Sequence, residues 1–142
     1  MSIKLEIISP EKVVLSQTVD MAVLPALEGD IAAMEGHVPM IFLLRAGVID
    51  LYQDNKVIHR LFVEDGFAEM QESCCTVLAK QVRKLNELSE EEGIKRLAKL
   101  QEEYNRVSGT NDTDKQRELI DRMQGANAII DLAVSDKHNQ TL

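Results

Sequence analysis

The spacing of apolar residues along this chain changes once, near Lys84, and this change limits what the chain can fold into. Before that point apolar residues recur at every second position, as in the Ile-Lys-Leu-Glu-Ile run that starts at Ile3. After it they recur at every third or fourth position. A period of two is typical of a half-buried strand, and a period near 3.6 is typical of an amphipathic helix. The sequence therefore predicts an α+β chain with two parts, residues 1–84 and residues 85–142.

The first part consists of short apolar segments separated by turn residues. Residues 9–12 and the polar run 53–56 indicate turns, and residues 71–73 indicate another. Strands with one apolar face need a second layer to bury that face. We therefore predict that residues 1–84 form an antiparallel β-sandwich.

Two positions are predicted to end or break strands in this part. We expect the strand with Val19, Met21 and Val23 on its apolar face to end at Pro25, because proline cannot donate to a strand ladder. We also expect Asp65-Gly66 to break the strand that starts at Val57.

The second part is predicted to form two antiparallel helices. Ser89 and Glu92 make a capping box, and Gly109 is expected to cap the first helix in a left-handed conformation. Asp112 or Thr113 is expected to cap the second helix. The predicted contact seams are Ile94, Leu97, Leu100, Tyr104 and Val107 on one helix, and Leu119, Met123, Ala126, Ile130 and Ala133 or Val134 on the other. Two such helices with a short connection should form a hairpin with a thin core.

Composition argues against several classes of function. The formal net charge is −8, with 24 acidic and 16 basic side chains, so the surface should repel nucleic-acid phosphates. Aromatic residues make up only 4% of the chain, which disfavours a base-stacking surface. No apolar run approaches the roughly 20 residues that span a bilayer.

No coherent catalytic, metal or cofactor site is predicted. The sequence holds no phosphate-binding glycine loop and no dinucleotide fingerprint. His37, His59 and His138 are not at metal-ligand spacing, and Cys74 and Cys75 are adjacent in the sequence. Adjacent strand residues point to opposite faces, so these cysteines are expected to stay reduced, one packed inward and one facing water.

The segment 24–40 is unlike ordinary strand sequence. It holds two prolines, two glycines and several ionisable side chains among apolar residues. Such a mixture is typical of a bent loop at the end of a sheet. The residues alone leave open a plain strand connection, a docking surface, or a small-ligand or reaction site near His37.

Several motifs in residues 1–84 resemble the epsilon subunit family of F-type ATP synthases, which is called delta in mitochondria. The chain has an "SPE" turn at residues 9–11, an "EGD" followed by "GHVP", an "AGVI" strand, a "DGFAE" and a "TVLA". These motifs occur in the family's order and close to its spacing. The resemblance in residues 85–142 is to the architecture, and the sequence match there is weak.

The resemblance implies a sandwich of about ten strands that docks on the gamma subunit and on the ring of c subunits. It implies that the loop with the "EGD" and "GHVP" motifs faces the ring. Carried over by position, the ring-facing residues are Glu28, Gly29, Asp30, Gly36, His37 and Pro39. Carboxylates and an imidazole can make charge-assisted hydrogen bonds to polar ring loops. Ala26, residues 32–35 and Ala46 depart from the family's pattern in and near this loop.

The resemblance also implies a regulatory role for the helical hairpin. In the family the hairpin can open and inhibit ATP hydrolysis by contact with the alpha and beta subunits, and some members bind ATP through an I/L-D-x-x-R-A motif. Here Gln124 and Gly125 replace the Arg and Ala, which leaves Asp121 and Arg122 as the candidates, and we expect weak or no nucleotide binding. The second helix is poor in net positive charge, so any charge-steered inhibition should be weak.

Two functional hypotheses follow. The first is a non-catalytic rotor subunit that joins the gamma subunit to the c-ring, needs no cofactor or metal, and sits at the cytoplasmic face of the bacterial inner membrane through its complex alone. The second is an unrelated cytoplasmic β-sandwich that binds a small ligand or acts as an enzyme near His37.

Overall fold

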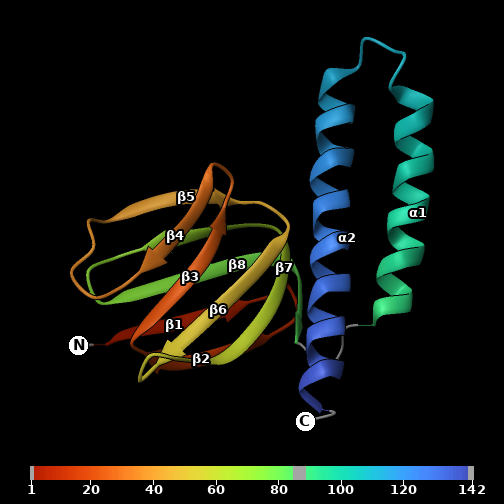
Figure 1. The fold of residues 1–142 in the computed structure, drawn as a ribbon. Coiled ribbons are helices and arrows are strands. Elements are labelled where there is room, and N and C mark those ends of the chain that lie inside the picture. Colours follow the sequence, from red (N-terminus) through yellow and green to blue (C-terminus); the bar gives the residue numbers. More distant parts are fainter. Residues whose placement is uncertain (1, 85–88, 141–142) are drawn as a thin grey trace. The chain divides into compact units, whose positions relative to one another are not determined.

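The computed structural model of the chain describes residues 2–84 and 89–140, with side chains described as far as residue 134. The chain divides into two compact units, Met1–Lys84 and Leu85–Leu142 (Figure 1).

The first unit is a β-sandwich. Figure 1 shows its strands in two layers that share the long strand β7. In chain order the eight strands are β1 (Ile3–Ile8), β2 (Val13–Val19), β3 (Met21–Ala26), β4 (Gly29–Ala33), β5 (Met40–Leu44), β6 (Gly47–Gln53), β7 (Lys56–Met70) and β8 (Cys74–Lys84). The hydrogen-bonded order is β2-β1-β8-β7-β5-β3-β4, and β6 pairs with β3 and β7. The predicted antiparallel sandwich is confirmed, although β1 and β8 pair in parallel.

Strand β7 joins the two layers because it changes partner along its length. Its first half pairs with β6 as far as Val63, and its second half pairs with β5 from Gly66 onward. Asp65 lies between the two halves with a φ of 57°. The break expected at Asp65-Gly66 is therefore a bend within one continuous 15-residue strand. The structure has eight strands, whereas the resemblance implied about ten, and the continuous strand β7 accounts for part of this difference.

Gly66 allows β7 and β8 to approach closely at this bend. A Cβ atom on Gly66 would overlap the carbonyl oxygen of Leu78 and would lie 2.8 Å from the Cα of Ala79. Both are backbone atoms of the paired strand, so they have little room to shift.

The predicted strand around Met21 is wrong in two respects. The chain bends at Asp20, and Ala22 and Leu24 are the fully buried residues of β3, whereas Val23 is half-buried. Pro25 does not end the strand but pairs with Asp30 inside it. Its carbonyl accepts a hydrogen bond from the backbone N–H of Arg45 at 2.9 Å, so Pro25 still takes part in the sheet as an acceptor.

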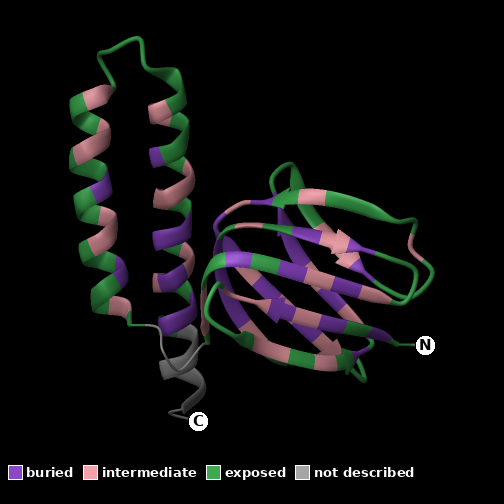
Figure 2. Cartoon of the chain, turned by 180° about the vertical axis from the view of Figure 1, so that it is seen from behind, coloured by how far each residue is buried: buried purple, intermediate pink, exposed green. Residues whose placement is uncertain are grey.

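The sandwich core consists of the inward residues of both layers. Buried and exposed positions alternate along the strands (Figure 2), as in β1, where Ile3, Leu5 and Ile7 are fully buried. The predicted turn at residues 53–56 is also confirmed, since Asp54 and Asn55 have φ values of 53° and 62°. Two successive left-handed residues make the hairpin turn that matches the twist of the flanking strands.

The second unit holds two helices, α1 (Glu90–Val107) and α2 (Thr113–Gln140). Ser89 caps α1 by accepting a hydrogen bond from the backbone N–H of Glu92, at 3.3 Å. Asp112 caps α2 by accepting one from the backbone N–H of Lys115, at 3.1 Å. Gly109 has no left-handed φ, and α1 ends at Ser108 in a right-handed conformation, so the predicted glycine cap is wrong.

The helices pack through most of the predicted seam. Leu100, Leu119 and Ala126 form the buried cluster, and Leu97, Tyr104, Val107 and Met123 pack against it. Ile94 is exposed, contrary to prediction, and Gly93 is buried beside it. A Cβ on Gly93 would lie 2.7 Å from Cγ1 of Ile130, so the backbone of α1 approaches α2 closely at this turn.

Candidate docking surface

The predicted ring-facing residues lie at the two ends of strand β4. Glu28 belongs to the turn between β3 and β4, and Gly29 and Asp30 are the first two residues of β4. Gly36, His37 and Pro39 follow the strand in its connection to β5 (Figure 1). A five-residue strand spans roughly 16 Å, so the segment forms two separate turns and not one loop.

The β3–β4 tip, residues 27–30, is exposed and carries the two carboxylates. Gly29 has a φ of 145°, with no atom within 4 Å of an added Cβ. Asp30 accepts a hydrogen bond from Nη2 of Arg45 at 2.6 Å, and Nη1 of the same side chain donates to the carbonyl of Ala26 at 2.6 Å. Ala26 needs no left-handed backbone conformation, because among the described residues only Asp54, Asn55 and Asp65 have a positive φ without being glycine. This departure from the family's pattern is therefore tolerated.

The β4–β5 connection is held by the turn between β7 and β8. The backbone N–H of Gly36 donates to the carbonyl of Glu72 at 2.8 Å, and Gly36 has a φ of 89°. His37 is half-buried, and Pro39 is exposed. An open hollow of about 590 Å³ beside this connection is lined by Pro39, Met40, Ile41, Glu69, Met70 and Gln71, and His37 is not among these residues.

An exposed apolar row crosses the outer face of the sandwich. Leu43 pairs with Phe67, Phe67 pairs with Leu78, Leu78 pairs with Ile8, and Ile8 pairs with Val13. Directly paired residues project from the same face of a sheet. The N–H of Leu27 donates to the carbonyl of Leu43 at 2.9 Å, so the row begins at the β3–β4 tip. We call these six residues, Leu27, Leu43, Phe67, Leu78, Ile8 and Val13, the apolar row.

The row remains accessible to a partner. Leu43 is 61% exposed, Leu27 is 57% exposed and Val13 is 56% exposed. A shallow hollow of about 300 Å³ lies along its centre, lined by Ile8, Phe67 and Leu78 together with Ser9, Pro10, Asp65, Ala79 and Lys80. Contiguous exposed apolar side chains with a polar margin are typical of a protein–protein contact.

No reaction centre or metal site is evident in the described part of the chain. Its histidines, cysteines and carboxylates form no cluster of three or more that could hold a metal ion. Burial raises the pKa of the Cys75 thiol to about 12, and the adjacent Cys74 adds to this rise. Such a thiol is a poor nucleophile near neutral pH.

Asp50 is a carboxylate of the sandwich whose pKa is raised above its ordinary value. Burial raises the pKa of its carboxyl group, the nearby charge of Arg60 lowers it, and the charge of Asp30 raises it further. Its Oδ1 lies 3.2 Å from Nε of Arg60, outside good hydrogen-bonding geometry. The ion pair offsets part of the burial effect but not all of it.

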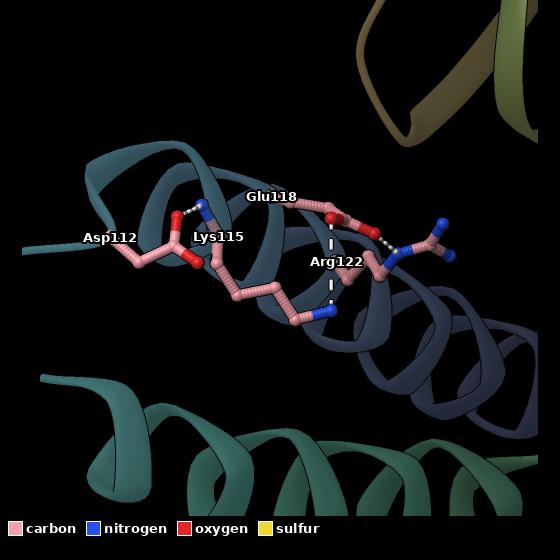
Figure 3. Close-up of polar contacts among 4 residues, drawn as sticks. All are labelled: Asp112, Lys115, Glu118 and Arg122. Atoms are coloured by element: carbon pink, nitrogen blue, oxygen red, sulfur yellow. Dashed lines mark hydrogen bonds and ion pairs between the residues drawn. The ribbon is translucent and has the colours of Figure 1, made fainter. Parts of the chain in front are cut away.

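The nucleotide candidates lie on α2, where neighbouring charges engage them. The Nε of Arg122 donates to Oε1 of Glu118 at 3.3 Å, one turn earlier on the helix. Oε2 of the same carboxylate lies 3.8 Å from Nζ of Lys115 (Figure 3). Asp121 is half-buried and Gln124 is exposed. Arg122 is thus part of a surface ion-pair chain along the helix.

Two features of the surface were not predicted from the sequence. Arg45 was not identified as a partner of Asp30, although it directly follows β5 and precedes the tight approach of Gly47 to Pro25. The apolar row was also missed. Its signal was the run of five apolar residues at positions 40–44, which gives β5 two apolar faces where a half-buried strand needs only one.

Comparisons with known proteins agree on one family. A sequence model described as "ATP synthase, Delta/Epsilon chain, beta-sandwich domain" matches residues 2–84. The ATP synthase epsilon chain of Gluconacetobacter diazotrophicus is 50% identical over 133 residues, which cover 94% of each chain. That of Granulibacter bethesdensis is 45% identical over 129 residues, which cover 91% of this chain and 95% of the relative.

Solved structures show the same fold. A chain in the cryo-EM structure of the OSCP/F1/c-ring part of Euglena gracilis mitochondrial ATP synthase superposes with a TM-score of 0.71 at 17% identity. The superposition covers 90% of this chain and 79% of that chain. At this identity the likeness concerns the fold alone.

Proposed function

The chain belongs to the ATP synthase epsilon chain family, and on that basis we propose that it is a non-catalytic rotor subunit in the central stalk of a proton-translocating F-type ATP synthase. In this proposal the sandwich joins the gamma subunit to the c-ring, and the helical hairpin weakly restrains ATP hydrolysis. The relatives match both units of the chain, which favours this function over an unrelated sandwich with a ligand site near His37.

The apolar row is the observation that carries the proposal. A rotor joint transmits torque, so it needs a broad complementary surface and not a single strong contact. The row extends over five strands on one outer face, from Leu27 at the β3–β4 tip to Val13 on β2. We assign this face to the gamma subunit, because exposed apolar area in a subunit of a stable complex is best explained by its burial in that complex.

The turns at the two ends of β4 are proposed to face the c-ring. Glu28 offers a carboxylate at one end, beside Asp30 in its ion pair with Arg45, and His37 offers an imidazole at the other. Gly29 and Gly36 supply the left-handed backbone that shapes these turns, and Pro39 stiffens the second. Since β4 separates the two ends, contact with both would spread the interface over more than one ring loop.

The hairpin is proposed to act as a weak regulatory element. Helix α2 carries four basic and five acidic side chains, so an acidic partner loop would find little net attraction there. Any contact with the alpha and beta subunits would then depend on packing. Nucleotide binding is not expected, because Gln124 lacks a guanidinium group and Arg122 pairs with Glu118.

The chain is proposed to lie at the cytoplasmic face of the bacterial inner membrane through its complex. Among the described residues no helix is both long enough and apolar enough to cross a bilayer. In this proposal the chain associates with the membrane by way of the c-ring.

A matched pair of substitutions on β7 tests the proposal. Phe67 belongs to the apolar row and is 39% exposed, whereas Ile58 lies outside it and is 37% exposed. Phe67→Asp should release the chain from a complex purified through a tagged gamma subunit, because it places a charge in an apolar interface. Ile58→Asp should be retained. Equal retention of both variants would contradict the assignment of this face.

Deletion of residues 85–142 tests the regulatory part separately. The truncated sandwich should still join the complex, and ATP hydrolysis by the purified enzyme should rise. If hydrolysis is unchanged while proton coupling persists, the hairpin has no inhibitory role.

A further inference from the structure

Arg45 is the residue through which three separate segments meet at the β3–β4 tip. Its backbone N–H donates to the carbonyl of Pro25 at 2.9 Å. Its guanidinium group donates to the carbonyl of Ala26 and to Oδ1 of Asp30, each at 2.6 Å. The end of β3, the start of β4 and the β5–β6 connection are thus tied together by one side chain and its own backbone.

The chemistry of these contacts requires an arginine. A guanidinium group presents donors in a fixed planar fork, so it can hold a carbonyl and a carboxylate at the same time. The Arg45 side chain is 30% exposed, which protects the fork better than the open surface would. A lysine at this position could reach one acceptor but would lose the fixed geometry between the two.

The base of the tip is closely packed around the same residue. A Cβ on Gly47 would lie 2.9 Å from the Cβ of Pro25, so the β5–β6 connection runs directly against β3. Beyond this base, residues 27–29 have no buried side chain to fix them. The position of the tip therefore depends on the pairing of Pro25 with Asp30 and of Ala26 with Gly29, to which the Arg45 contacts and the Leu27–Leu43 backbone hydrogen bond are added.

We propose that Arg45 is a positioning residue that clamps the β3–β4 tip, and that Asp30 acts in docking through Arg45 and not by direct contact with the partner. This proposal rests on the proposed function for its docking half, since the tip is assigned there to the c-ring. It divides the two carboxylates of the tip by role. Asp30, whose side chain is 58% exposed, is the partner of Arg45, and Glu28 is the matched carboxylate in the same tip.

The first test uses the isolated full-length chain and does not depend on any partner. Hydrogen exchange is followed in peptides that cover residues 26–31. Arg45→Gln and Asp30→Asn should each speed exchange there by about threefold to tenfold, the change expected when a charge-assisted hydrogen bond that limits local opening is lost. Arg45→Lys should recover part of the protection, and Glu28→Gln should leave it unchanged. Exchange in β1 and β2 should not change in any variant.

The second test measures binding to a purified complex of the gamma subunit and the c-ring. Arg45→Gln, Asp30→Asn and the double variant should weaken binding by the same factor within about twofold, because residues that act as one unit are not additive. Glu28→Gln should weaken binding independently, so its fold-change and that of Arg45→Gln should multiply when the two substitutions are combined. The denaturation midpoint measured for strands β1 and β2 serves as the control for a general loss of stability in the sandwich.

The outcomes separate the clamp from the proposed function. Unchanged exchange in Arg45→Gln, or effects of Asp30→Asn and Arg45→Gln that multiply in binding, would overturn the proposal. If the unsubstituted chain fails to bind the purified complex, the proposed function fails, while the exchange results still decide whether Arg45 clamps the tip.

Discussion

Substitution of Gly66 by alanine probes the bend that joins the two layers of the sandwich. The added Cβ would overlap the carbonyl oxygen of Leu78 and would lie 2.8 Å from both Cα and Cβ of Ala79. No flexible side chain stands in the way that could rotate aside, so the β7–β8 ladder itself must shift. Phe67 and Leu78 of the apolar row lie in the same paired segment.

The expected magnitude follows from the nature of the clash. Overpacking within a close-packed region typically costs about 1 to 3 kcal/mol, and the upper end applies here because the opposing atoms are backbone. A domain of this kind has a free energy of unfolding of about 5 to 15 kcal/mol, so the loss should be easy to detect. Gly109→Ala is the control, because Gly109 has open space around it and no left-handed φ. It should be neutral or slightly stabilising.

Hydrogen exchange at increasing denaturant concentration provides the assay, since it reports on the sandwich and the hairpin separately. Gly66→Ala should lower the unfolding midpoint of peptides from β7 and β8 and leave peptides from α1 unchanged. A midpoint for β7 and β8 equal to that of the unsubstituted chain would refute the close approach of the two backbones.

Three further predictions concern titration, thiol reactivity and nucleotide binding. Because the pKa of Asp50 is raised above 3.8 in the fold, the stability contributed by its neutral form is present below that value and is lost as the pH rises through the folded pKa. Asp50→Asn should therefore be more stable than the unsubstituted chain in denaturation at pH 7, and a difference that persists below pH 3.8 would contradict this cause. Titration of the native chain with a thiol reagent at pH 8 should modify Cys74 and spare the fully buried Cys75, with both reacting after unfolding; rapid reaction of two thiols in the native state would disprove the burial. Calorimetry with ATP should give no saturable heat, and micromolar binding would show that Gln124 does not prevent a nucleotide site.

The sequence predicted the elements of the sandwich well where one physical signal dominated. Alternation of apolar and polar residues located β1, and the polar run at residues 53–56 located the hairpin turn between β6 and β7. The strand around Met21 was misplaced because a bend at Asp20 reverses which residues face inward. Alternation gives the period but not the residue at which the phase changes.

The errors in the predictions for the two helices have a similar cause. Periodicity placed Ile94 in the seam, but the close approach of α1 and α2 requires a residue without a side chain, and Gly93 meets that need. Gly109 was expected to cap α1, yet the loop is closed by other contacts. Nε2 of Gln116 donates to the carbonyls of Val107 and Thr110 at 2.9 Å and 3.1 Å. Side-chain hydrogen bonds that span six to nine residues are not visible in the spacing of apolar residues.

The candidate site was only partly predictable for the same reason. The motif residues were identified, but strand β4 separates them into two turns, which only the pairing with β3 reveals. The apolar row depends on the register of neighbouring strands, because Leu43, Phe67 and Leu78 are distant in sequence and meet through pairing. Register is set by the whole sheet, so it lies beyond a reading of single segments.

If the apolar row is the face that is buried against the gamma subunit, side-chain footprinting will detect its protection. The full chain is exposed to hydroxyl radicals alone and in complex with the purified gamma subunit. Oxidation of Leu43, Phe67 and Leu78 should fall in the complex, while oxidation of Val57 and Ile58 should stay the same. Unchanged oxidation of the row, with protection of Val57 and Ile58 in its place, would contradict this prediction.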